Sequence, residues 1–467
     1  MANFFIPAGK SQEKNQQLIV TIDKLDMNGV GVARWKNKPV FIAGALPKEV
    51  VKVKVLEQKS KYIRAKLLSV QQRSDIRVEP QCQHFGLCGG CDLQMIDVNS
   101  QLSFKQEKVT ELFSRCFSAL NLTNKKEKTV LPWQANLIDN PWHYRRKARI
   151  GVQFDKKAHA TIGFRKKATN QLTAIKSCPI LVTPLNEVFH LLRRLLAQLS
   201  IKSAIGHIEL IQADVIDKKQ QEQHSINNQT IVVVRQLKPM NDADSQLWQL
   251  SAEKYNWFVL IDDGLSQTTL NENMFSNSAL LSYRLADNTR VTFSSSDFIQ
   301  INHNINIDMI NQALSWLNLS VEDSVLDLFC GLGNFSLALA KQSKFVVGVE
   351  GVQMMVDKAN YNAKINNIKN CSFYQADLNS DWLSECWLKE NHFDKVLLDP
   401  ARAGAEKAVK QIATLKIPYV LYVSCDPATL ARDSAILVSK GYKLDKISLM
   451  DMFSQTKHVE TMVLFTL

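Results

Sequence analysis

Apolar and polar residues alternate in short runs between about residues 15 and 70, a pattern typical of β-strands with one buried face. Val51, Val53 and Val55, for example, are separated by two lysines, so apolar groups would line one face and ammonium groups the other. Glycine-containing turns would allow such strands to close into a small barrel. We therefore expect a barrel of the OB type, a fold that often binds single-stranded RNA. A module that only packs on its neighbour is the alternative, but the basic face favours RNA.

The pattern changes at about residue 320, where short β-rich runs alternate with helical stretches and each run ends in a polar or glycine-containing loop. This alternation is typical of an open, mostly parallel sheet with helices on both faces. In such sheets ligands bind at the carboxyl ends of the strands, so functional residues should follow the runs directly. The predicted strands are SVLDLFC, KFVVGVE, CSFYQAD, FDKVLLD and YVLYVSC.

The chain between these two regions is expected to hold a helix and two basic strands. Residues 101–120 have helical apolar spacing, and the polar stretch 121–129 is expected to be a linker. The runs HYRRKARIGVQF and ATIGFRKKA then predict two strands joined by a short turn. Arg145, Lys147 and Arg149 would share one face of the first strand, either as a ridge that contacts phosphates or as an ordinary solvated face.

Composition adds a partner and a compartment to this picture. The chain of 467 residues has a formal charge of +12, which suggests a polyanionic partner such as nucleic acid, although many basic proteins have none. No apolar run approaches the roughly 20 residues that cross a bilayer, and the start, MANFFIPAGKSQEK, lacks the pattern of a secretory signal. We therefore expect a cytoplasmic protein with no membrane partner, whose nine cysteines are thiols rather than disulfides.

The first predicted strand of the parallel sheet leads into the loop CGLGNFS, whose glycines would let the backbone pass close to a ligand. A dinucleotide-binding fold is the competing interpretation, but its fingerprint needs a third glycine where this chain has Ser336. Glu350 ends the next strand, where an acid would hydrogen-bond two ribose hydroxyls, and Asp377 ends the third, where a carboxylate would receive the amino group of an adenine. The residues that together favour S-adenosylmethionine over NAD are Asp327, Gly331, Gly333, Glu350 and Asp377.

Cys425 follows the last predicted strand within VSCDP, in the same layer of loops as Asp399. A cysteine at a strand end is often only a buried structural thiol. Beside a methyl donor it suggests a particular reaction, because C5 of uracil is a poor nucleophile until a thiolate adds at C6. A base must then remove the C5 proton so that the thiol can leave. Glu460 is the candidate for that base, and His458 is its rival.

Three further cysteines lie close together in the spacing Cys82-x5-Cys88-x2-Cys91. Zinc and iron–sulfur clusters both accept ligation by cysteine alone, and both need a fourth ligand. Cys178, which precedes a proline, is the first candidate for that ligand, and Cys116 is the second. The spacing favours an iron–sulfur cluster over zinc without excluding zinc.

With these residues identified, the chain resembles the RNA (uracil-5)-methyltransferase family over nearly its full length. The motifs that carry the resemblance are CQHFGLCGGC, DFIQIN, DLFCGLGNFS, LLDPARAGA, VSCDPATLARD and KHVETMVLF. The resemblance implies that Cys425 is the nucleophile and Glu460 the base. The implied ligands of a 4Fe–4S cluster are Cys82, Cys88, Cys91 and Cys178. The implied contacts to S-adenosylmethionine are Gln300, Phe329, Asn334, Glu350, Asp377 and Asp399.

The same resemblance implies an architecture. Residues 12–72 are expected to form a TRAM domain, an OB-type barrel that binds RNA. Residues 73–95 with 130–290 are expected to form a central iron–sulfur domain, and residues 96–129 with 291–467 the catalytic domain. The catalytic domain is expected to be a Rossmann-like α/β fold around a mostly parallel, seven-stranded sheet.

The resemblance also implies a substrate. Within the family, a barrel together with a cluster implies the group that acts on 23S ribosomal RNA, and hence the uridine at position 1939 in bacterial numbering. We also expect the protein to act as a monomer. The same chemistry on another ribosomal or transfer RNA uridine is an alternative. A non-catalytic RNA-binding assembly factor is another, but it would be favoured by a missing nucleophile or a broken cofactor loop, and neither is seen. A radical S-adenosylmethionine enzyme typically has a CxxxCxxC triad, which the cysteine spacing does not match.

Overall fold

The computed structural model describes residues 16–122, 130–216, 225–270, 275–276 and 279–467. The chain divides into two compact units, residues 1–108 with 455–457 and residues 109–454 with 458–467. Residues 1–15, which include the start MANFFIPAGKSQEK, lie outside the described residues, as does most of the polar stretch expected to be a linker. None of the described helices is long and apolar enough to span a membrane.

Five described strands of the first unit close into a barrel in the order β1-β2-β3-β5-β4. β3 and β5 pair in parallel, and the other neighbours pair antiparallel. The alternating valines of β4 point into the core, where Val51, Val53 and Val55 are at most 1% exposed. The barrel predicted from this alternation is therefore confirmed. The strands are β1 (Gln17–Leu25), β2 (Gly31–Trp35), β3 (Lys38–Ala43), β4 (Val50–Gln58) and β5 (Ile63–Gln72).

The cysteine-rich segment 82–91 is joined to the barrel of its own unit by contacts on both sides of it. Before the segment, Arg77 donates hydrogen bonds to the fully buried carboxylate of Glu49, one of them at 2.8 Å. After the segment, Leu93 packs with Leu46 in a small apolar cluster. The chain then enters α1 (Val98–Ala119), the helix that the apolar spacing predicts, and the division between the two units falls within it.

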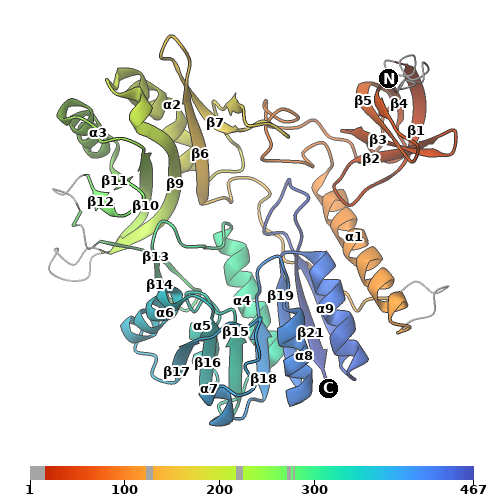
Figure 1. Cartoon of the computed structure of the whole chain (residues 1–467), viewed down its shortest axis with the longest axis vertical. Helices are drawn as coiled ribbons and strands as arrows, with labels where there is room; N and C mark the ends of the chain where they lie inside the picture. Colours follow the sequence, from red (N-terminus) through yellow and green to blue (C-terminus); the bar gives the residue numbers. More distant parts are fainter. Residues whose placement is uncertain (1–15, 123–129, 217–224, 271–274, 277–278) are drawn as a thin grey trace, which may run out of the picture. The chain divides into compact units, whose positions relative to one another are not determined.

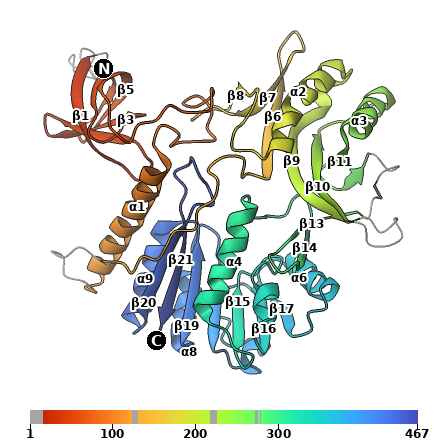
Figure 2. The same ribbon diagram turned by 180° about the vertical axis from the view of Figure 1, so that it is seen from behind.

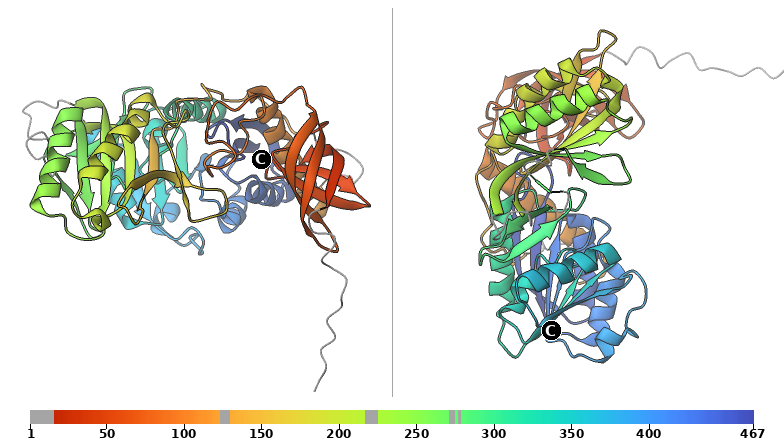
Figure 3. Two further views of the ribbon diagram at one scale, coloured as in Figure 1. Left: turned by 90° about the horizontal axis from the view of Figure 1, so that it is seen from above. Right: turned by 90° about the vertical axis from the view of Figure 1, so that its left-hand side faces the viewer.

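Nine described strands of the second unit form one sheet, with the main path β12-β11-β10-β9-β6-β7-β8 and with β13 and β14 joined to it at β9. α2 (Thr183–Gln198) and α3 (Asp242–Tyr255) lie side by side against this sheet (Figure 3). The two basic runs predicted as strands are β6 and β7, which pair antiparallel. The elements are β6 (Lys147–Phe154), β7 (Ala160–Arg165), β8 (Leu172–Ala174), η1 (Lys202–Ala204), β9 (Ile205–Ile216), β10 (Ser225–Gln236), β11 (Trp257–Asp262), β12 (Gln267–Thr269), β13 (Leu280–Arg284) and β14 (Arg290–Phe293).

The remainder of the second unit contains a sheet in the order β17-β16-β15-β18-β19-β21-β20. β15 to β19 pair in parallel, and β21 runs antiparallel between β19 and β20. α8 and α9 cover one face of the sheet, and α4 lies on the other (Figures 1 and 2). The strands are β15 (Ser324–Leu328), β16 (Phe345–Glu350), β17 (Cys371–Gln375), β18 (Lys395–Leu398), β19 (Tyr419–Ser424), β20 (Lys443–Met450) and β21 (Glu460–Thr466). The helices are α4 (His303–Leu317), α5 (Ser336–Ala340), α6 (Gln353–Ile365), α7 (Cys386–Lys389), α8 (Glu406–Leu415) and α9 (Pro427–Ser439).

The strand order of this sheet reverses at β15, because β16 lies on one side of it and β18 on the other. In an open α/β sheet such a reversal leaves a crevice beyond the carboxyl ends of the strands, and ligands bind there. The loops that follow β15, β16, β18 and β19 meet at this edge. The residues that end or directly follow these four strands are Phe329, Glu350, Asp399 and Cys425.

Candidate active site

The loop after β15 turns sharply and brings a backbone amide against Glu350. Phe329 has a φ of +62°, which is rare for a bulky residue, and Gly331 has a φ of +55°. A Cβ added at Gly331 would meet no described atom within 4 Å. The amide of Gly331 donates to the Glu350 carboxylate at 3.2 Å. The bent backbone therefore leaves open space next to the acid that ends β16.

Asp327 lies in the same region, among negative charges. Its side chain accepts a hydrogen bond from the Ser336 hydroxyl through Oδ2, while the buried Oδ1 has no hydrogen-bond partner among the described residues. Burial, together with the charges of Asp399 and Glu350, raises the pKa of Asp327 to about 7. A carboxyl group next to two other carboxyl groups would be stabilised in its charged form by a bound cation. S-adenosylmethionine carries a sulfonium and an ammonium group, so these residues fit it.

The other residues expected to contact the cofactor come from separate elements. Gln300 precedes α4 and is 8% exposed. Asn334 lies in the loop after β15 and accepts a hydrogen bond from the Tyr283 hydroxyl at 2.8 Å. Asp377 follows β17 and is exposed. Their role as cofactor contacts stays a prediction.

Cys425 and Glu460 lie beside each other because two neighbouring strands end together. Ser424 at the end of β19 pairs with Thr461 of β21, so the next residues, Cys425 and Glu460, come opposite each other at the end of the ladder. Cys425 is partly exposed, whereas Glu460 is 3% exposed. A substrate can therefore reach the thiol, while the carboxyl group is held in the protein interior.

The surroundings of this pair oppose ionisation of both groups. Burial, and then the charges of Glu460 and Asp399, raise the pKa of the Cys425 thiol to about 11, and the guanidinium of Arg402 acts in the opposite direction. Burial and the charge of Asp399 also raise the pKa of Glu460 well above its ordinary value. Positive charge in the site would therefore favour both the thiolate and the carboxylate. Arg402 supplies one such charge, and a cationic cofactor would supply more.

A buried carboxylate ties the loop after β18 to the strand that leads to Cys425. Asp433 of α9 is fully buried and accepts hydrogen bonds from the Ala405 amide and the Tyr422 hydroxyl, each at 2.7 Å. Gly404, with a φ of +76°, lets the loop approach so closely that an added Cβ would lie 2.7 Å from this carboxylate. Asp433 therefore fixes the positions of loop and strand relative to each other.

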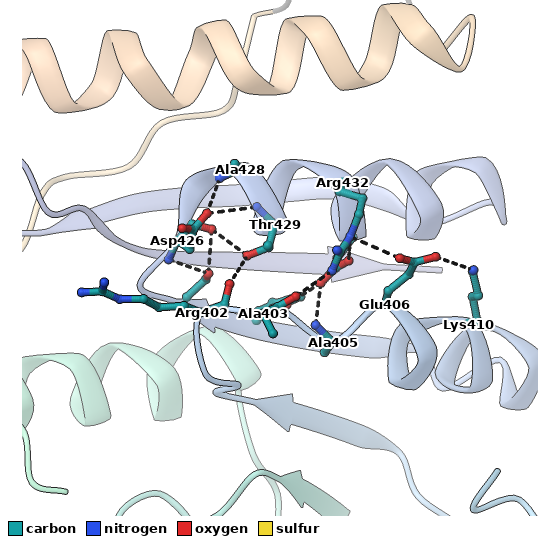
Figure 4. A network of polar contacts seen from close by, with 12 residues as sticks. Arg402, Ala403, Ala405, Glu406, Lys410, Asp426, Ala428, Thr429 and Arg432 are labelled. Atoms are coloured by element: carbon teal, nitrogen blue, oxygen red, sulfur yellow. Dashed lines mark hydrogen bonds and ion pairs between the residues drawn. The ribbon is translucent and has the colours of Figure 1, made fainter. Parts of the chain in front are cut away.

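The first turn of α9 makes a second tie to the same loop (Figure 4). Asp426 caps the helix by accepting hydrogen bonds from the amides of Ala428 and Thr429 at 2.9 and 3.2 Å. The Thr429 hydroxyl donates to the carbonyl of Arg402 at 3.3 Å. The Arg402 side chain extends away from this network (Figure 4), so its charge remains available to the site.

The cysteines expected to ligate a cluster are distributed over both units. Cys82, Cys88 and Cys91 belong to the first unit, and Cys178 belongs to the second. The amide of Gly90 donates to the Cys88 sulfur at 3.4 Å, a contact that a thiolate ligand accepts well. Among the described residues, no group of three or more His, Cys, Asp or Glu side chains is arranged to hold a metal ion. The cluster therefore stays a prediction.

Two residues are rival candidates for roles in the site: His458 for the base, and Cys116 for the fourth ligand of the cluster. The ring of His458 packs edge-on against Phe453, with the ring centres 5.7 Å apart. Cys116 lies within α1, where burial raises the pKa of its thiol. A high thiol pKa disfavours the thiolate form that a metal requires.

The basic ridge expected on β6 is partly used for structure. Lys147 donates to the carbonyls of Ser295 and Asp297 at 2.5 and 2.8 Å, and burial lowers the pKa of its ammonium group. Arg149 pairs with Glu209 at 2.6 Å, but its side chain stays 64% exposed. Of these two cations, Arg149 remains able to meet a phosphate.

The sequence analysis assigns no role to Arg402 or Asp433, although each lies in a motif that carries the resemblance. Arg402 shares the motif LLDPARAGA with Asp399, and this proximity is the signal that could have identified it. Asp433 stands in a helical run, where an isolated carboxylate is normally expected to face solvent. No local pattern indicates that it is buried.

Comparison with known proteins gives concordant matches. A family model described as tRNA (Uracil-5-)-methyltransferase matches residues 128–467, and one described as TRAM domain matches residues 12–68. A relative from Colwellia psychrerythraea, named 23S rRNA (uracil(1939)-C(5))-methyltransferase RlmD, is 68% identical over 466 residues, which cover 100% of this chain and 99% of the relative. A protein of the same name from Psychromonas ingrahamii is 42% identical over 472 residues and is covered completely, as is this chain.

A solved structure also matches nearly the whole chain. The crystal structure of Pyrococcus abyssi tRNA (uracil-54, C5)-methyltransferase in complex with S-adenosyl-L-homocysteine aligns with a TM-score of 0.70 and 21% sequence identity. The alignment covers 96% of this chain and 100% of that chain. At this level of identity the likeness shows a shared fold.

Proposed function

The chain belongs to the tRNA (uracil-5-)-methyltransferase family, and on that premise we propose that it transfers a methyl group from S-adenosylmethionine to C5 of uridine 1939 in 23S ribosomal RNA. The observation that carries the proposal is the pairing of the Cys425 thiol with the buried Glu460 carboxyl group at the carboxylate-rich edge of the α/β sheet. The names of the relatives favour the ribosomal substrate over transfer RNA.

In the proposed reaction the thiolate of Cys425 forms a bond to C6 of the uracil, and the electrons of the C5–C6 double bond move toward C5 and O4. C5 then takes the methyl group, and the broken bond leaves its electron pair on the sulfur of the cofactor. The carboxylate of Glu460 removes the proton from C5. The electrons of that C–H bond restore the C5–C6 double bond, and the thiolate of Cys425 leaves with the electrons of the S–C6 bond.

S-adenosylmethionine, when bound, supplies an electrophilic methyl group. We propose that Gln300, Phe329 and Asn334 contact it together with the carboxylates of the crevice, which are Glu350, Asp377 and Asp399. Asp327 Oδ1 has no hydrogen-bond partner in the described part of the chain, which supports an occupant that donates a hydrogen bond or carries positive charge. Burial raises the pKa of Asp399 to about 7, so a cation beside it would favour its charged form. Arg402 stabilises the thiolate of Cys425 in the same region.

The thiol pKa of about 11 predicts that attack on the uracil becomes faster as the pH rises. Only the thiolate attacks, and its fraction grows about tenfold for each unit by which the pH rises, as long as the pH stays below the pKa. The rate of attack should therefore grow by the same factor. Arg402→Gln should move this rise to higher pH, because it removes the charge that lowers the pKa. The measurement is the single-turnover rate of covalent complex formation with a 5-fluorouridine RNA between about pH 6 and about pH 9. A rate independent of pH in the wild type would contradict this account of Cys425.

Asp433→Asn should lower kcat about 10²-fold, because displacement of a catalytic group by about 1 Å can have an effect of that size. The amide keeps the shape of the side chain but removes the negative charge of the carboxylate, whose Oδ2 accepts from both Ala405 and Tyr422 and whose Oδ1 accepts from the Arg432 guanidinium. Tyr422→Phe, which removes one of these hydrogen bonds, is the matched milder variant. The KM for S-adenosylmethionine and the melting temperature are measured alongside kcat. A loss of activity that only follows a loss of folded protein would show that Asp433 does not position the site.

The barrel is proposed to bind ribosomal RNA. Tyr62 is partly exposed and carries two cations over its ring, Lys59 at 5.8 Å and Arg64 at 5.5 Å from the ring centre. Lys61 and Lys66 are exposed nearby in sequence. Aromatic rings flanked by cations are typical of surfaces that hold single-stranded RNA through stacking and phosphate contacts.

We further propose that Cys82, Cys88, Cys91 and Cys178 hold a 4Fe–4S cluster with no part in the methyl transfer. The donor set supports this, because four thiolates are the usual ligands of such a cluster. Protein purified without oxygen should be brown and contain iron with acid-labile sulfide, whereas stoichiometric zinc without sulfide would refute the cluster. Cys88→Ser should lose iron and folded protein, and Cys116→Ser, the matched control, should lose neither.

We propose three domains with the bounds that the resemblance implies. Residues 12–72 would bind RNA, residues 73–95 with 130–290 would carry the cluster, and residues 96–129 with 291–467 would catalyse the reaction. We also propose that the protein acts in the cytoplasm, where its ribosomal substrate is made, and that it acts as a monomer.

The proposed function is tested with purified protein, S-adenosylmethionine and 23S ribosomal RNA that lacks the modification. Nuclease digestion and mass spectrometry of the fragments should show 5-methyluridine at position 1939. Methylation at a different uridine, or of transfer RNA instead, would overturn the assigned substrate while leaving the chemistry intact.

A further inference from the structure

The second unit contains a cavity of about 720 Å³ that the proposed reaction does not use. Its walls come from the segment 139–146, from β9, from β13 and from the start of α4. Neither Cys425 nor Glu460 lines it, and neither do the carboxylates of the cofactor crevice. The volume lies in the range of sites that hold one small ligand, about 300–1,000 Å³.

A buried cation lines this cavity. Arg146 is 6% exposed, and its guanidinium lies 4.5 Å from the centre of the Tyr283 ring. Nη1 contacts Nδ1 of His303 at 3.2 Å, and burial and the charge of Arg146 lower the pKa of His303 to about 4, so the imidazole is neutral. Nη2 has no hydrogen-bond partner among the described residues. Asp214 lines the same cavity, and its charge compensates part of the charge of Arg146. Nη2 still lacks an acceptor, and an acceptor oxygen beside it would stabilise the guanidinium.

Two further polar groups of the lining resemble Arg146 Nη2 in that they are buried without a hydrogen bond to the described residues. Ser282 Oγ and Asn302 Nδ2 are both buried and have no hydrogen-bond partner in the part of the chain that the structure describes. Buried polar groups are normally satisfied, so three unsatisfied groups in one lining indicate a site that a polar ligand completes. The rim adds the partly exposed indole of Trp142 and several side-chain amides, including Asn140 and Asn288.

The lining also connects to the residues expected at the cofactor. Arg146 Nε donates to the carbonyl of Gln300 at 2.9 Å. Tyr283, against which the guanidinium packs, donates its hydroxyl proton to Asn334 Oδ1 at 2.8 Å. A ligand that contacts Arg146 would therefore act on Gln300 through its backbone carbonyl and on Asn334 through Tyr283, and binding at the two sites would be linked. Such a link favours the RNA as the ligand of this cavity, because the RNA reacts together with the cofactor, whereas an unrelated metabolite does not.

We propose that this cavity binds one unpaired nucleotide of the RNA substrate, distinct from the uridine that is methylated. Its phosphate or carbonyl oxygens accept hydrogen bonds from Arg146, Ser282 and Asn302, and its base packs on Trp142. The proposal rests on the proposed function, because it takes RNA as the substrate. A free nucleotide carries the same base, sugar and phosphate groups, so the test must distinguish a nucleotide within the RNA from a free one.

The test measures the affinity of the full-length protein for RNA fragments in which each nucleotide near the target uridine is made abasic in turn. Trp142→Ala should weaken binding of the intact RNA about tenfold, which is the size of one base–aromatic stacking contact. One abasic position should weaken binding to the wild type by a similar factor and have no further effect on Trp142→Ala. Trp142→Phe keeps an aromatic ring and should restore most of the affinity and the sensitivity to that position.

Equal losses in wild type and Trp142→Ala at every abasic position would overturn the proposal. Binding of nucleoside monophosphates to the cavity, without any RNA position that depends on Trp142, would assign it to a free nucleotide and would also overturn it. Methylation by the wild type is measured on the same RNA. If methylation occurs but no position is coupled to Trp142, only the nucleotide site fails, whereas absence of methylation would reject the proposed function itself.

Discussion

Cys425→Ala protein should not methylate RNA and should form no covalent complex with it. Without the thiolate, C6 receives no electron pair and C5 stays a poor nucleophile, so bound cofactor and bound RNA do not react. Loss of a nucleophile of this kind lowers the rate by about 10⁴-fold or more. Cys425→Ser should behave in the same way, because a hydroxyl is a far weaker nucleophile than a thiolate at neutral pH.

The measurement is incorporation of labelled methyl into RNA, together with the amount of RNA that migrates with the protein on a denaturing gel. Cys386→Ser is the matched control, because Cys386 is an exposed cysteine outside the proposed site and its loss should change neither quantity. Methylation by Cys425→Ala at even a tenth of the wild-type rate would rule out covalent catalysis by Cys425.

Glu460→Gln should stop the reaction at a later step and trap the protein on its product. The variant keeps Cys425, so the thiolate still adds to the uracil and the methyl group is still transferred. The amide cannot take the C5 proton, and loss of a general base lowers a rate by about 10²–10⁴-fold. Because Glu460 is 3% exposed and glutamine has nearly the same shape, packing should be preserved. A protein–RNA band should therefore appear with ordinary RNA, and Cys425→Ala should lack it.

The rival base provides the control for this result. His458→Ala should turn over without accumulating the covalent complex, because His458 packs against Phe453 and has no assigned part in proton removal. Accumulation of the complex by His458→Ala, with normal turnover by Glu460→Gln, would transfer the role of base to His458.

Local sequence patterns predict much of this fold, because a strand with one buried face alternates apolar and polar residues, and a strand with two buried faces is a continuous apolar run. The alternating valines of β4 enter the barrel core, as their spacing indicates. The apolar runs from SVLDLFC onward become parallel strands, and parallel strands place their carboxyl ends along one edge. The sequence therefore suffices to group the glycine loop with Glu350, and the Gly331 amide donates to that carboxylate.

Long-range pairing is what local patterns do not encode. Cys425 and Glu460 come together because β21 inserts antiparallel between β19 and β20, and nothing in either segment specifies that register. The sequence also does not show which cations are buried. Lys147 alternates with apolar residues as a solvated lysine would, yet carbonyls of a distant segment surround its ammonium group. For the same reason the sequence does not show that Arg146 is buried, because its neighbours Tyr283, Gln300 and His303 come from two distant segments of the chain.

The central claim is that Cys425 forms a bond to the uracil that receives the methyl group. It is tested most directly by mass spectrometry of the complex formed with S-adenosylmethionine and an RNA fragment that contains 5-fluorouridine at the target position. Fluorine at C5 cannot leave as a proton, so the reaction should stop after methyl transfer. The account predicts one conjugate whose mass is that of protein plus RNA, with one methyl group in place of the thiol proton, and proteolysis should locate the bond at Cys425. Absence of a conjugate, or a conjugate on another cysteine, would contradict it.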